Sequence, residues 1–203
     1  MSGASGPSSR PLAIVTGGAQ RVGRATSLAL GRAGCDVLLT YRASERAAIA
    51  TRDDVRALGV NAEALPLDLS DLDAVRSLGE SLASRARVDI LVHNASVYEP
   101  SPLDSLSAEQ SLRHYRVNAL APLLLTRALA ARLRESPLPG GGAVVAMCDI
   151  HAMDKPRRNF AAYNLSKAAL AQMVLSLAMD LAPRVRVNGV APGVVAFPES
   201  GYE

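Results

Sequence analysis

The sequence lacks the features that mark membrane, secreted and metal-binding proteins. No apolar run approaches the ~20 residues that span a bilayer. Residues 1–10 have no apolar centre of the kind a signal peptide needs, so they are expected to form a disordered tail. The two cysteines, Cys35 and Cys148, show no metal-binding spacing. These absences favour a cytoplasmic protein with no membrane segment and no metal centre.

Lysine is also scarce. Of the 22 basic residues only Lys155 and Lys167 are lysines, and 19 acidic residues bring the net charge to +3. The basic residues are spread along the chain without a block interleaved with aromatics, so no nucleic-acid surface is expected. Because arginine is used almost wherever a positive charge is needed, Lys167 suggests a role that requires a compact ammonium group.

Apolar residues make up 49% of the 203 positions, which suits a single domain over residues 11–203. Short apolar runs alternate with helical patterns throughout, so the predicted fold is a doubly wound, parallel α/β sheet of the Rossmann type with strand order 3-2-1-4-5-6. Ser70 is expected to cap the third helix, and residues 107–110 to begin the next with a capping box. We expect strands at 12–16, 36–41, 62–67, 89–93, 143–147 and 185–191.

A glycine-rich turn follows the first strand, from Gly17 to Gly23, and leads into a helix. Strand, glycine turn and helix together form a cradle for phosphate groups. The second strand ends without the carboxylate that would hold the 2′-hydroxyl of NAD, because Asp36 lies at its opposite end. Arg42 and Ser44 follow that strand and suit a 2′-phosphate, which favours NADP(H).

Tyr163 and Lys167 are four residues apart in a predicted helix, so their side chains share one face. An ammonium about 4 Å from a phenolate is worth roughly 4 kcal/mol at an effective dielectric constant of 20. Such a charge is expected to lower the tyrosine pKa from about 10 by roughly 3 units and to make the phenol a general acid. The alternative is a surface pair without a chemical role.

Taken together, the motifs resemble the short-chain dehydrogenase/reductase family from Leu12 to Gly193. The resemblance lies in Thr16-Gly-x-x-x-Arg-x-Gly23, Asn94-Ala95, Asn118, Tyr163-x-x-x-Lys167 and Pro192-Gly193. It implies catalytic roles for Asn118, Tyr163 and Lys167. It also implies a cofactor site formed by Thr16, Gly17, Arg21, Val22, Gly23, Tyr41, Arg42, Ser44, Asp68, Leu69, Asn94, Ala95, Tyr163, Lys167, Pro192 and Gly193.

Three departures from the family pattern resemble its pteridine reductase branch. Arg21 replaces a loop glycine, Ser96 ends the His-Asn-Ala-Ser motif, and Asp149 replaces the catalytic serine after the fifth strand. The segment 195–199 also resembles that branch. The resemblance implies a pterin site formed by Arg21, Ser96, Tyr98, Asp149 and Tyr163.

Reduction of a pterin C=N bond puts a hydride on carbon and a proton on nitrogen, and a carboxyl group can donate that proton or share it with Tyr163. Asp149 is therefore expected to be catalytic, although a loop aspartate that caps a turn is the simpler alternative. His151 has no partner that can be named from the sequence.

Two other functions stay open at this point. One is a carbonyl or 3-oxoacyl reductase of the same fold. The other is a non-catalytic NADP-binding protein, because the chain ends ten residues after Gly193 whereas relatives continue into a substrate-covering segment and a last strand. The resemblance further implies a homo-oligomer. Because the region after Gly193 contributes to the subunit interface in relatives, the oligomeric state of this chain stays open.

Overall fold

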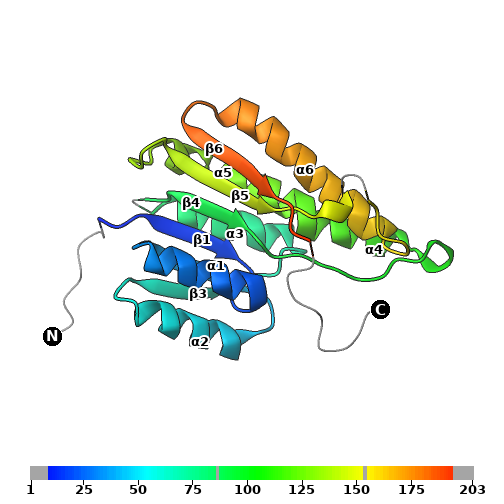
Figure 1. Cartoon of the computed structure of the whole chain (residues 1–203), viewed down its shortest axis with the longest axis horizontal. Helices are drawn as coiled ribbons and strands as arrows, with labels where there is room; N and C mark the ends of the chain where they lie inside the picture. The colour runs from blue at the N-terminus through cyan, green and yellow to red at the C-terminus, as the bar shows by residue number, and fades with distance from the viewer. Residues whose placement is uncertain (1–8, 86, 153–154, 194–203) are drawn as a thin grey trace.

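The computed structural model describes residues 9–85, 87–152 and 155–193. Its strands form one parallel sheet in the order β3-β2-β1-β4-β5-β6, which confirms the predicted fold and strand order (Figure 1). Parallel strands need crossover connections, and here helices provide them. The strands are β1 (Leu12–Thr16), β2 (Asp36–Tyr41), β3 (Ala62–Pro66), β4 (Ile90–His93), β5 (Gly142–Met147) and β6 (Val185–Val190).

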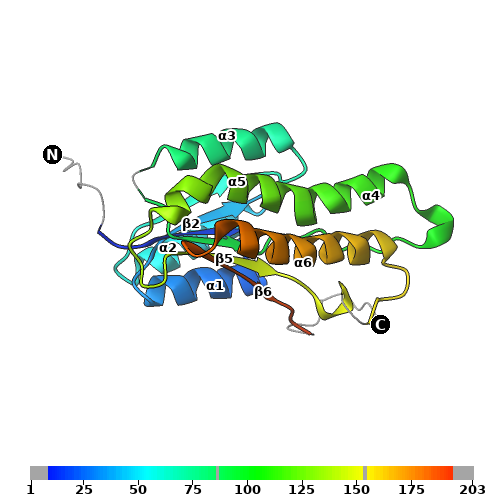
Figure 2. The same cartoon turned by 90° about the horizontal axis from the view of Figure 1, so that it is seen from above.

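The helices cover the two faces of this sheet. Helices α3, α5 and α6 pack together on one face with α4 beside α6, while α1 lies on the other face and packs against α2 (Figure 2). The helices are α1 (Arg21–Arg32), α2 (Glu45–Arg56), α3 (Leu72–Ala83), α4 (Ala108–Tyr115), α5 (Ala121–Arg134) and α6 (Ala161–Leu181). Short 3-10 turns lie at η1 (Leu103–Ser105) and η3 (Ile150–Ala152), and η2 (Arg116–Leu120) is π-helical.

Alternate strand residues build two cores, because successive side chains point to opposite faces of a sheet. Ile14 and Leu91 are fully buried in the larger core, with residues of α3, α5 and α6. Val15 and Val92 face the other way and pack with residues of α1 and α2. Burial on both faces explains why the central strands read as continuous apolar runs.

At the β6 end the sheet is covered on one side. Residues of β5 and β6 that face α6 are buried, while the alternate residues of β6, beginning with Arg186 and Asn188, are exposed. In the described part of the chain β6 is an edge strand. Residues 195–199, whose sequence resembles the pteridine reductase branch, lie outside the described residues.

The chain before β1 is described from Ser9. The carbonyl oxygen of Ser9 accepts a hydrogen bond from Arg87 at 2.7 Å, and Arg10 lies 3.9 Å from Asp36. These two residues, which the predicted tail 1–10 included, therefore contact the amino end of the sheet. The rest of that tail lies outside the described residues.

Two helix starts test the predicted caps. The prediction for Ser70 is wrong by one residue: Asp71 Oδ1 accepts from the amides of Asp73 and Ala74, both at 3.0 Å, and the Ser70 hydroxyl donates to Asp68 instead. An aspartate carboxylate is an equally good cap and carries the charge that a helix N-terminus favours. Ser107 does cap α4, accepting from the amide of Gln110 at 3.1 Å.

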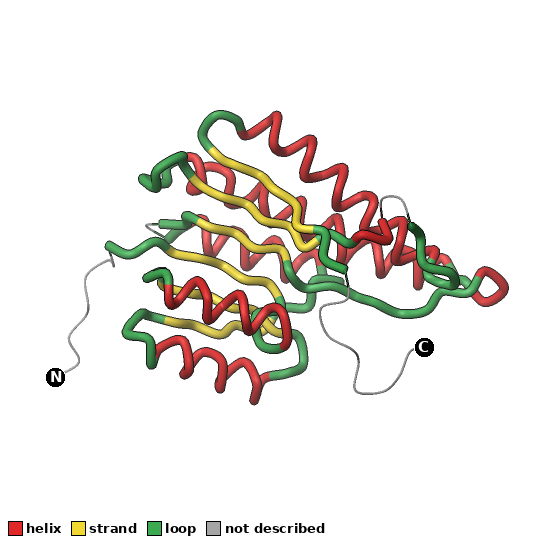
Figure 3. The backbone as a smooth tube through the Cα atoms, viewed as in Figure 1, coloured by secondary structure: helices red, strands yellow, loops and turns green. Residues whose placement is uncertain are grey.

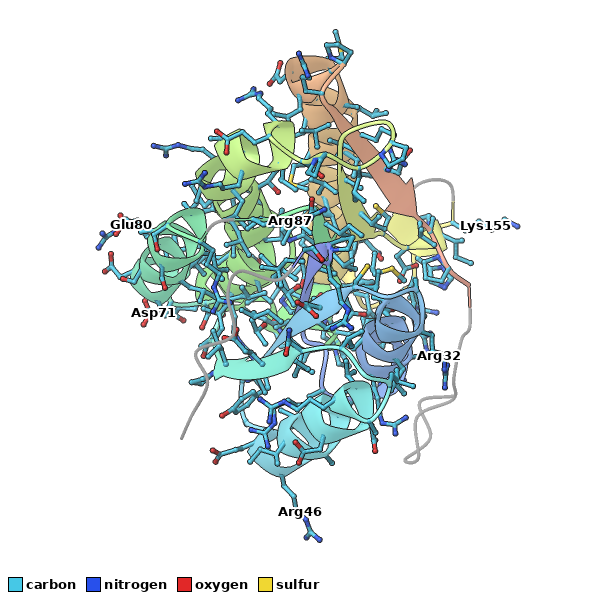
Figure 4. The ribbon with its side chains drawn as sticks, turned by 90° about the vertical axis from the view of Figure 1, so that its left-hand side faces the viewer. Arg32, Arg46, Asp71, Glu80, Arg87 and Lys155 are labelled. Atoms are coloured by element: carbon cyan, nitrogen blue, oxygen red, sulfur yellow. The ribbon has the colours of Figure 1, made fainter. Side chains whose placement is uncertain are left out.

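No described helix is long and apolar enough to cross a membrane. Charged side chains instead point away from the ribbon, among them Arg46 on α2 and Lys155 before α6 (Figure 4).

Candidate active site

The carboxyl ends of the parallel strands meet at one edge of the sheet, and the loops that follow them gather there (Figure 3). The loop after β4 runs out beside the start of α6, where Ser101 pairs with Phe160. This edge is where an open parallel sheet binds its ligands. Nearly all of the residues that the sequence singles out for cofactor, substrate and chemistry lie in or next to these loops.

The glycine turn after β1 is held by the strand-four loop. Asn94 Nδ2 donates to the carbonyl oxygens of Thr16 and Gly17, each at 3.0 Å, and Thr16 Oγ1 accepts from the amides of Asn94 and Ala95. A side chain at position 23 would not fit, because its Cβ would lie 2.0 Å from the Gly17 carbonyl oxygen. The turn thus has the tight shape that the predicted phosphate cradle requires.

Arg21 begins α1 with a φ of +48°, in the left-handed region that favours glycine. This conformation accounts for the glycine that the family pattern carries at this position. The arginine accepts about 1–2 kcal/mol of strain there. The first turn of α1, which includes Val22, has no acidic residue, and Gln20 makes no side-chain capping bond, so its N–H groups suit an anionic ligand.

The end of β2 fits the expected 2′-phosphate site. Tyr41 is the last residue of the strand, Arg42 is exposed, and Ser44 stands at the N-cap position of α2 without a side-chain capping bond. Asp36 lies at the other end of the strand, where its carboxylate accepts from Asn61. The strand itself thus has no acidic residue at this end, while Glu45 of α2 lies in hydrogen-bond contact with Tyr41.

Asp68 and Leu69 follow β3 at the same edge. The hydrogen bond from the Ser70 hydroxyl is the main cause that lowers the pKa of Asp68, and the charge of Arg42 contributes to the same direction. Asp68 is thus held as a carboxylate beside Arg42.

The catalytic candidates of β5 and α6 meet directly. The Tyr163 hydroxyl donates a hydrogen bond to Asp149 Oδ2 at 2.5 Å, although the two residues come from different elements. Asp149 Oδ1 accepts from the His151 amide at 2.7 Å, which fixes the carboxylate. Lys167 Nζ donates to the Met147 carbonyl at 2.7 Å and lies 5.9 Å from the Tyr163 ring centre.

The electrostatics of this group correct one prediction. Burial raises the pKa of Tyr163 well above its ordinary value, and the hydrogen bond and charge of Asp149 raise it further. Burial also lowers the pKa of Lys167 to about 8. The expectation that Lys167 lowers the Tyr163 pKa is wrong for this structure, because the ammonium bonds to a backbone carbonyl and the phenol is desolvated beside a carboxylate.

Asn118 lies in the π-helical segment η2, and such bulges often mark functional sites. Its side chain is fully used: Oδ1 accepts from the Val97 amide and the Ser96 hydroxyl, while Nδ2 donates to the Val97 carbonyl and the Ser166 hydroxyl. Asn118 thereby ties the strand-four loop to α6 behind Tyr163. Its catalytic role stays a prediction, because no described bond joins its side chain to Lys167.

An aromatic wall, defined here as Tyr98, Phe160 and Tyr163, borders the proton pair. Tyr98 stacks on Phe160 with ring centres 4.7 Å apart and meets the Tyr163 ring edge-on at the same distance. Tyr98 remains 41% exposed, so this wall is open to a ligand. Phe160 was not predicted as a site residue; its position one helical turn before Tyr163 is the signal that could have indicated it.

The remaining residues take simpler positions. His151 Nδ1 lies 2.7 Å from the Lys155 carbonyl, so its ring fastens the loop. His93 is buried, and burial lowers its pKa to about 3, which keeps it neutral beside Thr126. Pro192 and Gly193 follow β6, and a Cβ at Gly193 would lie 3.7 Å from the Ile150 side chain.

The sequence model of the short chain dehydrogenase family matches residues 11–200. The chain belongs to the short-chain dehydrogenase family. An uncharacterized oxidoreductase of Mycobacterium tuberculosis is 35% identical to it, over 91% of this chain and 69% of that protein. The acetoin dehydrogenase of Salmonella typhimurium has the same fold, with a TM-score of 0.86 and 28% identity over 94% of this chain and 75% of that one.

Two further short-chain dehydrogenases add chemical context. The 7alpha-hydroxysteroid dehydrogenase of Escherichia coli is 30% identical over 90% of this chain and 70% of that protein. A short-chain dehydrogenase from Sphingobium yanoikuyae in complex with NADPH has a TM-score of 0.82 and 26% identity, covering 93% of this chain and 72% of that one. These relatives establish an oxidoreductase family, and none of their names refers to a pterin.

The depressed pKa of Lys167 predicts an unusual pH dependence of stability. A free lysine has a pKa near 10.4, so below about pH 8 both states hold the proton and the cost of burying it is fully present. As the pH rises from about 8 towards 10.4 the folded state releases the proton first, and stability increases. Lys167→Met removes this dependence. Its stability relative to the parent should therefore fall by about 2 kcal/mol between pH 7 and 9.5 in urea unfolding.

The matched control is Lys155→Met, because Lys155 is exposed and its side chain points away from the ribbon (Figure 4). That variant should follow the parent at both pH values. Equal pH dependence in Lys167→Met and the parent would contradict the buried, depressed lysine.

Proposed function

We propose that this short-chain dehydrogenase is an NADPH-dependent reductase of a planar C=N substrate of the dihydropterin type. The observation that carries the proposal is the hydrogen bond from Tyr163 Oη to Asp149 Oδ2, at the position where the family pattern has a serine. A serine hydroxyl stabilises the alkoxide that forms when a carbonyl is reduced. A carboxylate in its place repels that negative charge, so the site suits a reaction that places a proton on nitrogen.

The site fits the cofactor because the cradle at Gly17 and Gly23 leaves no room for a side chain and the N-terminus of α1 offers free N–H groups. NADPH, when bound, supplies the hydride. Arg42 and Ser44 hold its 2′-phosphate in this proposal, and Arg21 assists the pyrophosphate. The remaining contacts come from Thr16, Val22, Tyr41, Asp68, Leu69, Asn94, Ala95, Tyr163, Lys167, Pro192 and Gly193.

The proton comes from the Tyr163–Asp149 pair. The raised pKa of Tyr163 keeps the phenol protonated at neutral pH, with its proton directed at Asp149. Reduction of a C=N bond creates a strongly basic nitrogen, to which even a weakly acidic phenol can deliver its proton. Asp149 can share that proton with the phenol, and its second oxygen is fixed by the His151 amide. The pair therefore acts as one acid.

The aromatic wall supports a flat substrate. A heterocycle can stack on the exposed Tyr98 ring, because aromatic rings favour offset stacking on one another. Ser96 lies in the same loop, two residues before Tyr98, and Arg21 contributes from the cofactor loop. These residues complete the substrate site in the proposal.

A carbonyl reductase is the second candidate, and the relatives favour it. Two of them are named for acetoin and for a hydroxysteroid, both of which are alcohols at the reacting carbon. A protein that binds NADPH without turning over any substrate is a third possibility. Assays with dihydrobiopterin, dihydromonapterin, dihydrofolate and acetoin's oxidised form, diacetyl, separate the three.

Self-association of this chain also remains a proposal. Leu112 and Tyr115 of α4 and Leu165 of α6 are exposed around an apolar groove of about 260 Å³, and contact between copies would bury apolar area there. A cytoplasmic location stays a prediction from the sequence.

Asp149→Ser tests the discriminating residue. The variant should lose about a hundredfold in kcat with dihydropterin, because half of the acid pair is removed, and should gain activity on a ketone. NADPH oxidation measured with each substrate gives both values. Asp180→Ser is the matched control, since Asp180 is exposed on α6. If the parent reduces ketones but no dihydropterin, and Asp149→Ser gains nothing, the pterin proposal fails.

Gly23→Ala tests the cofactor cradle. The added methyl group would overlap the Gly17 carbonyl and the Asn94 amide, so NADPH affinity should fall at least about tenfold, or ~1.4 kcal/mol. Fluorescence titration of NADPH measures the affinity directly. Gly31→Ala in the same helix is the control, because its methyl group meets only side-chain carbons of Leu58, Val55 and Val60. Unchanged NADPH affinity in Gly23→Ala would rule out this cradle.

A further inference from the structure

Arg157 is a basic residue at the substrate edge that neither the sequence motifs nor the chemistry above uses. Its guanidinium carbon lies 5.1 Å from the ring centre of Phe160 and 5.8 Å from that of Tyr98. The side chain is half-buried on the aromatic wall, one ring away from the reacting Tyr163. A guanidinium that stacks by its face keeps its N–H groups at the edge free to donate.

The segment that carries Arg157 is held in place. The Arg157 carbonyl accepts from Asn164 Nδ2 at 2.9 Å, which fastens it to the first turn of α6. Beside it, the Ser101 amide donates to the Asn159 carbonyl at 2.6 Å, and Ser101 Oγ accepts from the Ala162 amide at 3.0 Å. The strand-four loop and the segment before α6 are thus joined, so the guanidinium has a defined position on the aromatic wall.

Charge distinguishes Arg157 from a packing residue. In the ranges 9–85, 87–152 and 155–193, no carboxylate forms an ion pair with it. Its described neighbours are two aromatic rings, which attract the cation weakly, so within the described part of the chain no carboxylate compensates its charge. A half-buried, uncompensated guanidinium at the mouth of a ligand site binds carboxylate or phosphate groups well, often by two parallel hydrogen bonds.

We propose that Arg157 determines substrate specificity by binding an anionic group on the tail of the substrate, one aromatic ring away from the reduced bond. The inference rests on the proposed function in assuming a planar ring that stacks on the exposed part of Tyr98, next to the proton pair. Among dihydropterins, Arg157 thus selects those with an acidic tail over those with a neutral one. Dihydrofolate, whose tail carries carboxylates, is therefore preferred to dihydrobiopterin, whose tail is neutral. The occupant is thus a flat heterocycle that carries a carboxylate or phosphate.

The experiment compares substrates that share a reacting group and differ in tail charge. For the parent, kcat/KM should be higher for dihydrofolate than for dihydrobiopterin. In Arg157→Met, which keeps the apolar stem over the rings, this preference should fall about ten- to hundredfold, with the loss in KM rather than in kcat. Arg157→Lys should restore part of it. Arg158→Met is the matched control, since Arg158 is the exposed neighbour.

A second pair of substrates separates this inference from the proposed function. If no dihydropterin is reduced, 4-acetylbenzoate and its methyl ester present the same ketone with and without a carboxylate. The parent should then prefer the acid, and Arg157→Met should lose that preference. Calorimetric titration of folate and biopterin in the presence of NADP⁺ provides a readout independent of turnover.

Several results would overturn the inference. One is an equal loss on charged and neutral substrates in Arg157→Met, which would show that the guanidinium only packs the aromatic wall. Another is a parent that shows no preference for the anionic member of either pair. A loss in Arg158→Met equal to that in Arg157→Met would also count against it, because general surface charge would then suffice.

Discussion

The hydrogen bond between Tyr163 and Asp149 is the interaction on which the chemistry of this protein depends. It forms because the end of β5 and the start of α6 bring the two residues together at the carboxyl edge of the sheet, where Tyr163 is buried and Asp149 is half-buried. Burial and a neighbouring carboxylate act in the same direction and hold the proton on the phenol. The rest of the site surrounds this pair: Asn118 fastens the loop behind it, and the rings of Tyr98 and Phe160 border it.

Much of the fold follows from the sequence because its signals are local and repeated. Apolar runs separated by helical patterns allow few topologies once crossovers must be right-handed, and the strand order agrees with the prediction. The cofactor edge follows for the same reason, since Gly23 admits no side chain and Asp36 lies at the wrong end of its strand. The strand order and the cofactor edge can both be predicted because each depends on where residues stand along the chain.

The features that the sequence could not reveal depend on contacts across the fold. The spacing of Tyr163 and Lys167 predicts neighbours, but it cannot show that the ammonium bonds to the Met147 carbonyl, which is why the predicted pKa shift had the wrong sign. Asp71 rather than Ser70 caps α3 because the helix begins at Leu72, and the sequence does not fix a helix start to within one residue. The contact of Arg157 with Tyr98 cannot be predicted from the sequence, because it forms only once the strand-four loop lies beside the start of α6.

The most direct test of the account is the titration of Tyr163 itself in the protein alone. Carbon-13 labelling at the tyrosine ζ position, with Tyr163→Phe for assignment, reports its ionisation by NMR. We expect Tyr163 to titrate well above the ordinary value of about 10 in the parent and at a lower pH in Asp149→Asn, because the carboxylate charge is removed. A Tyr163 pKa near or below 10 in the parent, unchanged in Asp149→Asn, would contradict the central claim.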